Sequence, residues 1–502
     1  MADDSDPPND SDTPDVEPLL DGGQLIVVSN RQPYSHGYDE DGEVTVSRPA
    51  GGLTAGLDPV MQRVEGTWIA WGDGDADREV TPEDDTVEMP PEDPAYHLRR
   101  VWLTDEEVDQ YYYGYSNRVL WPLCHGGIWK TDFADEHREA YEAVNEKFAR
   151  AVREEADDDA VVWFQDYHFT RAPRMVREAM PDAFLMHFWH ITWPGWDTFR
   201  SLPHGQETLE GLLGNDLVGF HTGQYVENFL DCIERGLDGA TVDRGNNRVE
   251  YDGRTTEIES FPLSVDFEGI AASAERFDAE DWDAFREEYG ITGERVAVGV
   301  DRLDYTKGVP ERLNALEQLW EDHPEWRGEL TYVQKASESR SIIPDYRDLQ
   351  DRVTTGVDRI NERFGTDDWT PVVYLDEHLD GDTLNGLYRH SDVMLVSALR
   401  DGMNLVAKEF VAAQVDETGV LVLSNQTGAF EELGKHSVGI NPHDTDEFAA
   451  AIGEALRMPE DERRERMHTM REWVETHDLS RWMKDVFEGA ADVRMKRRMG
   501  MD

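Results

Sequence analysis

Short runs of apolar residues alternate along this chain with longer stretches of helical periodicity, and this alternation limits the possible folds most strongly. The runs have four or five residues, which is typical of strands buried on both faces of a parallel sheet. In the first half they are Leu25–Ser29, Thr67–Trp71, Val161–Phe164, Phe184–Phe188 and Leu217–Phe220, with helical patterns at Glu136–Glu155 and Tyr225–Arg235.

The second half contains the same alternation. Its apolar runs are Val296–Val300, Leu330–Val333, Val372–Leu375, Val393–Val396 and Val420–Ser424. Its helical patterns cover Pro310–Glu321, Tyr346–Phe364, Leu405–Ala413 and Thr445–Arg457. The two series join near Phe261–Phe267.

Two successive series predict an α/β protein with two doubly wound, Rossmann-like domains, and 502 residues are enough for two cores. Ligands of doubly wound sheets bind outside the carboxyl ends of the strands, so we expect the site in a cleft where the two domains face each other. The predicted division is a disordered acidic tail at 1–21, one domain at 22–264, a second at 265–480, and a C-terminal helix and tail at 481–502.

The charge of the chain limits its partners. Lys and Arg number 48 against 107 Asp and Glu, giving a formal net charge of −59 that is spread along the chain. Such a surface repels phosphate backbones and anionic lipids, which argues against nucleic-acid and membrane binding. We interpret the acidity, together with only eight lysines, as adaptation to a halophilic, high-salt cytosol, where screening reduces self-repulsion. A lysine in a loop is then a strong functional candidate.

Other features predict a soluble, cytoplasmic protein. Cys124 and Cys232 are far apart and form neither a disulfide framework nor a zinc pattern, which suits a reducing compartment. The segment Met1–Asp21 lacks the basic and apolar regions of a signal peptide. No apolar run approaches the ~18 residues that indicate a membrane span.

Two loops of the second half carry groups that would bind a diphosphate. Arg302 and Lys307 lie between an apolar run and a helical pattern, where both cations would neutralise phosphates, although a surface salt-bridge pair is the alternative. After the run Val393–Val396, residues 402–406 would present backbone N–H groups at a helix N-terminus. Asp401 would accept hydrogen bonds from sugar hydroxyls. Glu409 would reach a ribose, the alternative being a solvated helix face.

The first half supplies further candidates near strand ends. Arg31 follows the first apolar run, and the Gly51-Gly52 pair would let the backbone approach a phosphate closely, unless it is an ordinary turn. Asp166 and His190 lie at or just past strand ends, with a buried structural histidine as the alternative for His190.

Three more residues had competing interpretations. Tyr112 and Trp121 would each, taken singly, be core aromatic residues. Arg340 follows the run Leu330–Val333 and would, taken alone, be a surface cation. The sequence has no Gly-x-Ser-x-Gly elbow, His-Glu-x-x-His zinc helix or Gly-x-x-x-x-Gly-Lys-Ser/Thr phosphate loop.

Taken together and in order, these motifs resemble the trehalose-6-phosphate synthases, retaining glycosyltransferases of the two-domain GT-B architecture. The resemblance spans about Leu25 to Trp482. It rests on Val-Ser-Asn-Arg, the Gly-Gly-Leu loop, Tyr-Ser-Asn-x-Val-Leu-Trp-Pro, Asp-Tyr-His, Arg-Leu-Asp-Tyr-Thr-Lys-Gly and Leu-Arg-Asp-Gly-Met-Asn-Leu-Val-Ala-Lys-Glu.

The resemblance implies a role for each matching residue. The first domain would bind the acceptor sugar phosphate and the second the nucleotide sugar. Donor-binding residues would be Gly52, Arg302, Lys307, Asp401, Gly402, Met403, Asn404, Leu405, Val406 and Glu409, with His190 against the donor sugar. Acceptor-binding residues would be Arg31, Tyr112, Trp121, Asp166 and Arg340, of which all but Asp166 surround the 6-phosphate. Arg302, Lys307, Asp166, His190 and Asp401 would form the catalytic set.

The implied reaction moves glucose from a nucleoside-diphosphate glucose to glucose 6-phosphate with retention, giving trehalose 6-phosphate, a step of compatible-solute synthesis for osmoprotection. The resemblance points to front-face substitution, in which the departing phosphate takes the acceptor's proton. We expect no metal and no cofactor, because the sequence shows no acidic metal cluster and the sugar nucleotide is a substrate. The alternatives are a glucosylglycerol-phosphate synthase that uses glycerol 3-phosphate, and a catalytically silent sensor of sugar phosphates.

The sequence leaves open whether the nucleotide is UDP, GDP or ADP, and whether the chain forms a homo-oligomer. It also departs from the family pattern. His190-Ile191-Thr192-Trp193-Pro194 replaces the usual His-Ile-Pro-Phe-Pro, Gln165 stands where His is usual, and Lys-Ala-Ser-Glu-Ser precedes Arg340 in place of an apolar-Pro-Ser pattern. These departures affect substrate preference rather than reaction class.

Overall fold

The computed structural model describes residues 15–39, 41–48, 52–337, 339–340 and 342–500. The chain divides into two compact units. The described residues up to Pro262, together with those from Ser480 onward, form unit 1, and Leu263–Leu479 form unit 2. Unit 2 is therefore inserted, in sequence, between the main part of unit 1 and its last helix.

Unit 1 is built on a ten-stranded sheet with the order β10-β11-β12-β9-β8-β7-β1-β4-β6-β5. Its strands are β1 (Leu25–Val28), β4 (Thr67–Trp71), β5 (Thr86–Met89), β6 (Tyr96–Val101), β7 (Val161–Gln165), β8 (Phe184–Phe188), β9 (Leu217–Phe220), β10 (Thr241–Asp243), β11 (Arg248–Tyr251) and β12 (Arg254–Ser260). All neighbours from β12 to β6 pair in parallel, whereas β5, β10 and β11 are antiparallel additions at the two ends. A separate hairpin pairs β2 (Ser35–Tyr38) with β3 (Val44–Ser47).

Helices connect these strands. They are α1 (Glu17–Leu20), α2 (Gly52–Val64), α3 (Asp77–Val80), α4 (Asp105–Glu107), the π-helix η1 (Val108–Leu120), α5 (Trp121–Cys124), the 3₁₀ turns η2 (Ile128–Lys130) and η3 (Tyr167–Phe169), α6 (Asp135–Glu155), α7 (Ala172–Ala179), α8 (Trp196–Phe199), α9 (Gly205–Leu212), α10 (Gly223–Gly236) and α20 (Leu479–Met499). The strands β1, β7, β8 and β9 are buried throughout, as expected for a parallel sheet covered on both faces.

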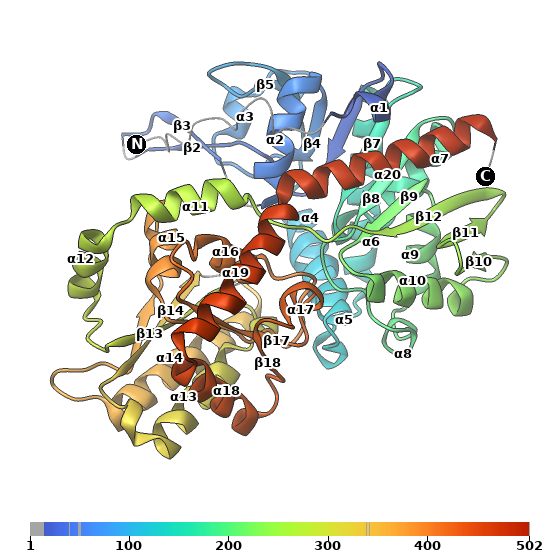
Figure 1. Ribbon diagram of the computed structural model, residues 1–502. Coiled ribbons are helices and arrows are strands. Elements are labelled where there is room, and N and C mark those ends of the chain that lie inside the picture. Colours follow the sequence, from blue (N-terminus) through green and yellow to red (C-terminus); the bar gives the residue numbers. More distant parts are fainter. Residues whose placement is uncertain (1–14, 40, 49–51, 338, 341, 501–502) are drawn as a thin grey trace. The chain divides into compact units, whose positions relative to one another are not determined.

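The last helix, α20, completes unit 1. Figure 1 shows it in red beside the first unit's elements. Its Trp482 indole N–H donates to the Phe261 carbonyl over 3.2 Å, and its ring lies 6.0 Å from that of Trp163. Nearer its end, the buried guanidinium of Arg494 donates to the carbonyls of Leu19 and Leu20. The C-terminal helix thus packs on the strand β7 and on the start of the chain.

The expected disorder up to residue 21 is wrong for the described part of that segment. Residues 17–20 form α1, and the apolar side chains of Val16, Leu19 and Leu20 are buried. Burial of three apolar side chains and the bonds from Arg494 offset the entropy of ordering this short acidic segment. Residues 1–14 of the predicted tail lie outside the described residues.

Unit 2 is a six-stranded parallel sheet with the order β15-β14-β13-β16-β17-β18. Its strands are β13 (Arg295–Arg302), β14 (Leu330–Ser337), β15 (Val372–Leu375), β16 (Val393–Val396), β17 (Val420–Ser424) and β18 (Val438–Ile440). Its helices are α11 (Phe267–Arg276), α12 (Ala279–Tyr289), η4 (Tyr305–Lys307), α13 (Val309–Asp322), η5 (Pro324–Trp326), α14 (Pro344–Phe364), α15 (Gly381–His390), α16 (Leu405–Ala413), α17 (Ala429–Leu433), α18 (Thr445–Arg457) and α19 (Glu460–Thr476).

Two apolar clusters cover the faces of this sheet, one involving α13, α14 and α18 and the other α11, α15, α16 and α19. The strand order of unit 2 is the doubly wound order 3-2-1-4-5-6, and six of the seven parallel strands of unit 1, β6-β4-β1-β7-β8-β9, follow it too. In each unit the order reverses between the first and fourth strands, which are β13 and β16 in unit 2 and β1 and β7 in unit 1.

Candidate functional site

The point where the strand order of unit 2 reverses brings together the two loops predicted to bind a diphosphate. The loop after β13 carries Lys307, and the loop after β16 carries Asp401. The Leu399 amide donates to the Thr306 carbonyl over 2.7 Å, and the Ser397 hydroxyl donates to the Gly308 carbonyl over 2.9 Å. These bonds hold the loops side by side at the carboxyl edge of the sheet.

Gly308 is required at this junction. Its φ is +66°, a left-handed conformation that side chains disfavour, and a Cβ there would overlap the carbonyl oxygen of Ser397. The close approach of the two loops therefore depends on the glycine that ends the Arg-Leu-Asp-Tyr-Thr-Lys-Gly motif.

The predicted site residues Lys307 and Asp401 form an ion pair. The Lys307 ammonium lies 2.5 Å from Oδ2 of Asp401, and both side chains are mostly buried. Asp401 also accepts from the Gly402 amide over 2.9 Å and from the Asn404 side-chain amide over 3.0 Å. The carboxylate is thus held by at least three donors, while the Lys307 ammonium has no other partner among the described residues.

Arg302 supplies a second cation at this edge. It is the last residue of β13, and its side chain is exposed. Among the residues that the structure describes, it has no ion-pair partner. The alternative of a salt-bridge pair therefore fails for Arg302 within this part of the chain, whereas Lys307 does have a carboxylate partner.

The N-terminus of α16 has the predicted form of an anion site. Asn404 has φ +77° and caps the helix, because its side-chain oxygen accepts from the Ala407 amide over 3.1 Å. The amides of the first turn, including those of Leu405 and Val406, are the ones that a helix leaves without intrahelical acceptors. The preceding residues Gly402 and Met403 are buried, and the Ala429 amide donates to the Met403 carbonyl over 2.8 Å.

Glu409 is half-buried on α16 rather than on a fully solvated helix face. The Tyr388 hydroxyl donates to its Oε2 over 3.2 Å, and burial raises the pKa of the Glu409 carboxyl. The neighbouring Lys408 is structural. Its buried ammonium donates to the Leu263 carbonyl and lies 2.6 Å from the Glu432 carboxylate.

Arg340 is not the surface cation that it would be if taken alone. Its side chain is 8% exposed, and it donates to the Tyr346 hydroxyl over 2.8 Å and to the Asp304 carboxylate over 3.2 Å. Asp304 caps η4 by accepting from the Thr306 amide. Arg340 is thereby connected to the loop of Lys307, a link that depends on Asp304 and Tyr346, which were not among the predicted site residues.

In unit 1, the reversal of strand order lies between β1 and β7, and Arg31 and Asp166 follow these two strands. Asp166 has φ +69°, and its Oδ1 accepts from the Tyr167 amide over 2.9 Å and the His190 amide over 3.2 Å. Asp166 and His190, each predicted at or just past a strand end, follow the neighbouring strands β7 and β8 and lie together.

Arg31 is exposed beside a buried polar network that was not predicted from the sequence. The fully buried Arg100 donates to the Gln32 side chain over 3.0 Å and lies 2.9 Å from the Asp77 carboxylate. Hydrogen bonds, chiefly from His36 and Gln32, hold the pKa of Asp77 below its usual range despite burial. This network fixes the loop next to Arg31. The residues of this network are far apart in sequence, so no local sequence pattern predicts their contacts.

Tyr112 and Trp121 are both buried, with 8% and 5% exposed. Tyr112 lies in the π-helix η1, and its ring stacks on that of His168 at 6.0 Å. Their burial agrees with the alternative of core aromatic residues and leaves their predicted contact with the acceptor a prediction. Gly52 is the first residue of α2, and Gly51 lies outside the described residues.

Within the described residues, no group of three or more His, Cys, Asp or Glu is arranged to hold a metal ion. No helix of this part is both long enough and apolar enough to cross a membrane.

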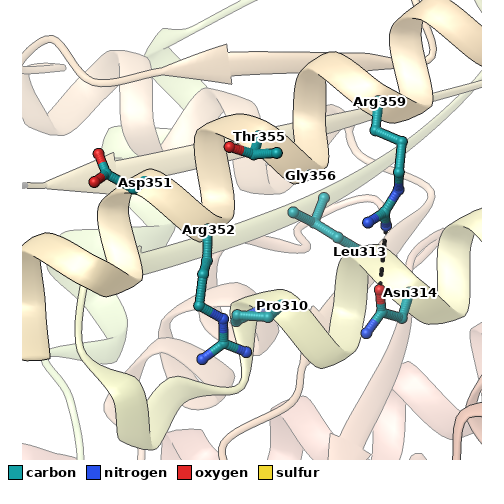
Figure 2. Close-up of a pocket in the computed structure, with 8 residues that line it drawn as sticks. All are labelled: Pro310, Leu313, Asn314, Asp351, Arg352, Thr355, Gly356 and Arg359. Atoms are coloured by element: carbon teal, nitrogen blue, oxygen red, sulfur yellow. Dashed lines mark hydrogen bonds between the residues drawn. The ribbon is translucent and has the colours of Figure 1, made fainter.

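A surface groove lies between α13 and α14 and contains none of the predicted site residues. Figure 2 shows Arg352 and Arg359 on α14 and Pro310 and Asn314 on α13 along its walls. Arg359 donates to Asn314 over 3.3 Å and lies 2.6 Å from Glu317. The polar side chains that line the groove thus partly bind one another, and we assign the groove no role.

Comparison with known proteins identifies the family. The model of the family described as glycosyltransferase family 20 matches residues 23–492. The chain belongs to glycosyltransferase family 20.

Relatives in this family match nearly the whole chain. The chain is 36% identical to an α,α-trehalose-phosphate synthase (UDP-forming) of Schizosaccharomyces pombe, over 91% of this chain and 88% of the relative. It is 38% identical to a trehalose-6-phosphate synthase of Mycobacterium avium, over 93% and 95%.

Solved structures also match nearly the whole chain. An E. coli structure described as bound with UDP-2-fluoro glucose is 32% identical with a TM-score of 0.83, covering 93% of this chain and 99% of that one. A Burkholderia xenovorans α,α-trehalose-phosphate synthase (UDP-forming) in complex with glucose-6-phosphate is 30% identical with a TM-score of 0.82, covering 93% and 100%. The predicted GT-B fold and the predicted class of enzyme, a glycosyltransferase, are confirmed for this family 20 chain.

Proposed function

We propose that this family 20 glycosyltransferase moves glucose from UDP-glucose to glucose 6-phosphate with retention of configuration and releases UDP and trehalose 6-phosphate. The observation that carries the proposal is the meeting of Lys307 and Asp401 beside Arg302 and the N-terminus of α16. This arrangement offers cations and amides to a diphosphate, and a fixed carboxylate to sugar hydroxyls, in a chain similar to UDP-forming synthases over most of its length.

The groups of unit 2 would act on the leaving group. As the bond from C1 of glucose to the diphosphate breaks, negative charge grows on the departing oxygen. Arg302, the Lys307 ammonium and the amides of Leu405 and Val406 would stabilise that charge. Asp401, already held by three donors, would accept from glucose hydroxyls without reorganising, and Glu409 would accept from the ribose.

The acceptor hydroxyl would attack on the face from which UDP leaves, and its proton would pass to the departing phosphate oxygen. No protein carboxylate then forms a covalent bond with the sugar. Asp166 and His190 would position sugar hydroxyls, and Arg31, Tyr112, Trp121 and Arg340 would recognise the acceptor. Fixing both substrates in place would supply much of the rate.

We further propose that the reaction needs no metal ion, because two cations and a helix N-terminus would carry the charge that a divalent metal neutralises elsewhere. Full activity in excess EDTA is expected, whereas a requirement for added Mg²⁺ or Mn²⁺ would contradict this point. We expect the reaction to take place in the cytoplasm, where the two buried, unbridged cysteines would stay reduced.

The test is an assay of purified protein in molar KCl. UDP-, GDP- and ADP-glucose are each combined with glucose 6-phosphate, glycerol 3-phosphate or free glucose. Release of the nucleoside diphosphate gives the rate, and NMR of the product gives the anomeric configuration. We expect UDP-glucose with glucose 6-phosphate to be the best pair and the product to be α,α-linked.

Other outcomes would change the assignment. A clear preference for glycerol 3-phosphate would make the chain a glucosylglycerol-phosphate synthase. Binding of sugar phosphates without turnover for any pair would make it a sensor. An inverted anomeric configuration would contradict front-face substitution.

A further inference from the structure

Gln165 is the last residue of β7 and stands where the family pattern usually has histidine. Its side chain is almost fully buried, and the side-chain oxygen lies 2.9 Å from Nε2 of His190, which follows the neighbouring strand β8. The pairing of β7 with β8 sets Gln165 opposite Phe188, two residues before His190. An uncharged amide thus contacts one nitrogen of a predicted catalytic ring.

The surroundings of His190 keep its ring neutral. Burial lowers the pKa of the imidazole well below its usual value, and the nearby histidines His221, His187 and His168 lower it further. Within the part of the chain that the structure describes, the one carboxylate bonded to this residue is that of Asp166, which accepts from the backbone amide of His190 and not from its ring. The His221 ring donates to the His190 carbonyl over 3.0 Å.

A neutral imidazole carries one proton, and the bond to Gln165 decides where it is. Because the amide oxygen can only accept, Nε2 donates to it and Nδ1 keeps its lone pair. Among the described residues, Nδ1 has no hydrogen-bond partner. The ring therefore presents an acceptor, and not a donor, to whatever lies beyond Nδ1.

We infer that Gln165 is a positioning residue that holds His190 in the form whose Nδ1 accepts a hydrogen bond from a substrate sugar hydroxyl. This inference rests on the proposed function for the identity of the sugar, but the state of the ring does not depend on it. An amide has no proton to gain or lose near neutral pH, so the acceptor form persists over a wide pH range.

Gln165→Glu tests this mechanism because it keeps the shape of the side chain and changes only its charge. A carboxylate beside Nε2 would favour the imidazolium, in which both nitrogens are protonated and Nδ1 can no longer accept. We expect kcat/KM of the variant to fall about tenfold per pH unit below the new pKa of His190. The parent should have no such limb between about pH 6 and 8.

Gln165→Leu removes the hydrogen bond without adding charge. We expect it to lower kcat/KM by up to about tenfold at every pH, with no new limb, which is the scale of one hydrogen bond. In a His190→Ala background neither Gln165 variant should lower activity further, because the residue through which Gln165 acts is gone.

The chain offers a matched control. Gln110 makes a similar contact, in which its side-chain oxygen lies 2.7 Å from Nδ1 of the buried His137, a residue outside the predicted site. Gln110→Glu therefore adds the same charge beside another histidine. We expect its pH profile to follow that of the parent.

A direct measurement separates this inference from the proposed function. NMR of protein labelled with ¹⁵N-histidine, with the His190 signals assigned from the His190→Ala spectrum, reports the ring's tautomer and charge even if no substrate pair is turned over. We expect a neutral ring protonated at Nε2 in the parent and an imidazolium near pH 6 in Gln165→Glu.

Either of two results would overturn the inference. One is a His190 ring protonated at Nδ1 in the parent. The other is additive losses for Gln165→Leu and His190→Ala. If Gln165→Glu does not fold, the double-mutant cycle of Gln165→Leu with His190→Ala and the NMR spectrum of the parent still test the inference. An inactive parent with the expected ring state would refute the proposed function alone.

Discussion

Replacing Lys307 with alanine should separate the chemistry of the site from its stability. Two effects are removed at once. The departing diphosphate loses a nearby cation, and Asp401 loses the ammonium at 2.5 Å. The first effect acts in the transition state and the second in the folded protein, so two measurements can distinguish them.

The structure sets the size of each effect. One electrostatic group aimed at developing charge contributes about 2.7–4 kcal/mol, so kcat should fall roughly 10²- to 10³-fold. The free energy of unfolding should change much less, because Asp401 keeps the Gly402 amide and the Asn404 side-chain amide as donors. The cost should be about 1 kcal/mol, or about 2–4 °C in the melting temperature of a unit of this size.

The assay is steady-state release of UDP with each substrate varied in turn, with thermal melts at the same salt concentration. Lys435→Ala is the matched control, because Lys435 is an exposed lysine of the same unit and should leave both measurements unchanged. A kcat for Lys307→Ala within about threefold of the parent would refute the role of this ammonium. A fall in melting temperature above 10 °C would instead give Lys307 a mainly structural role.

Three further predictions concern the acceptor, the loop junction and salt. Arg340→Ala should raise the KM for glucose 6-phosphate roughly ten- to hundredfold and leave the KM for UDP-glucose almost unchanged. An equal rise in both KM values would mean that the arginine only supports Asp304 and Tyr346. Gly308→Ala should lower the free energy of unfolding by about 2 kcal/mol or more in denaturant titrations, because the alanine would have a left-handed φ and its Cβ would overlap the carbonyl oxygen of Ser397. A change below about 0.5 kcal/mol would contradict this expectation. With a net charge of −59, folding and activity should require molar salt, and an unchanged circular dichroism spectrum with full activity after dialysis to low salt would contradict that.

Local patterns predicted the interior of the fold well. The parallel strands β1, β4, β7, β8 and β9 of unit 1 and β13, β14, β15, β16 and β17 of unit 2 were placed within a few residues, because a strand buried on both faces is a continuous apolar run with turn signals at its ends. The parallel strands β6, β12 and β18 were missed, because β6 and β12 mix charged with apolar residues and β18 has only three residues. The antiparallel strands β5, β10 and β11 at the ends of the first sheet were missed. They are short or partly exposed, and their runs mix charged with apolar residues, so their periodicity is weak.

The site was predicted in composition but not in its contacts. Lys307 and Asp401 were each expected at a strand end, yet nothing in the sequence indicates that they pair, because the strand order decides which loops become neighbours. The same holds for Arg340, whose partners Asp304 and Tyr346 are supplied by another loop and a helix. A motif identifies the residue types that a site needs, whereas bonds between distant segments follow from the topology.

The position of α20 after unit 2 in the sequence has a consequence for synthesis. On the ribosome, the strands of unit 1 emerge before unit 2, but the helix that covers Trp163 and bonds to the carbonyls of Leu19 and Leu20 emerges only after it. Unit 2 is contiguous in sequence and has all its residues available earlier. The nascent chain must therefore keep an incomplete apolar surface from aggregating until α20 has been made, and a chain that stops before α20 cannot complete the first unit.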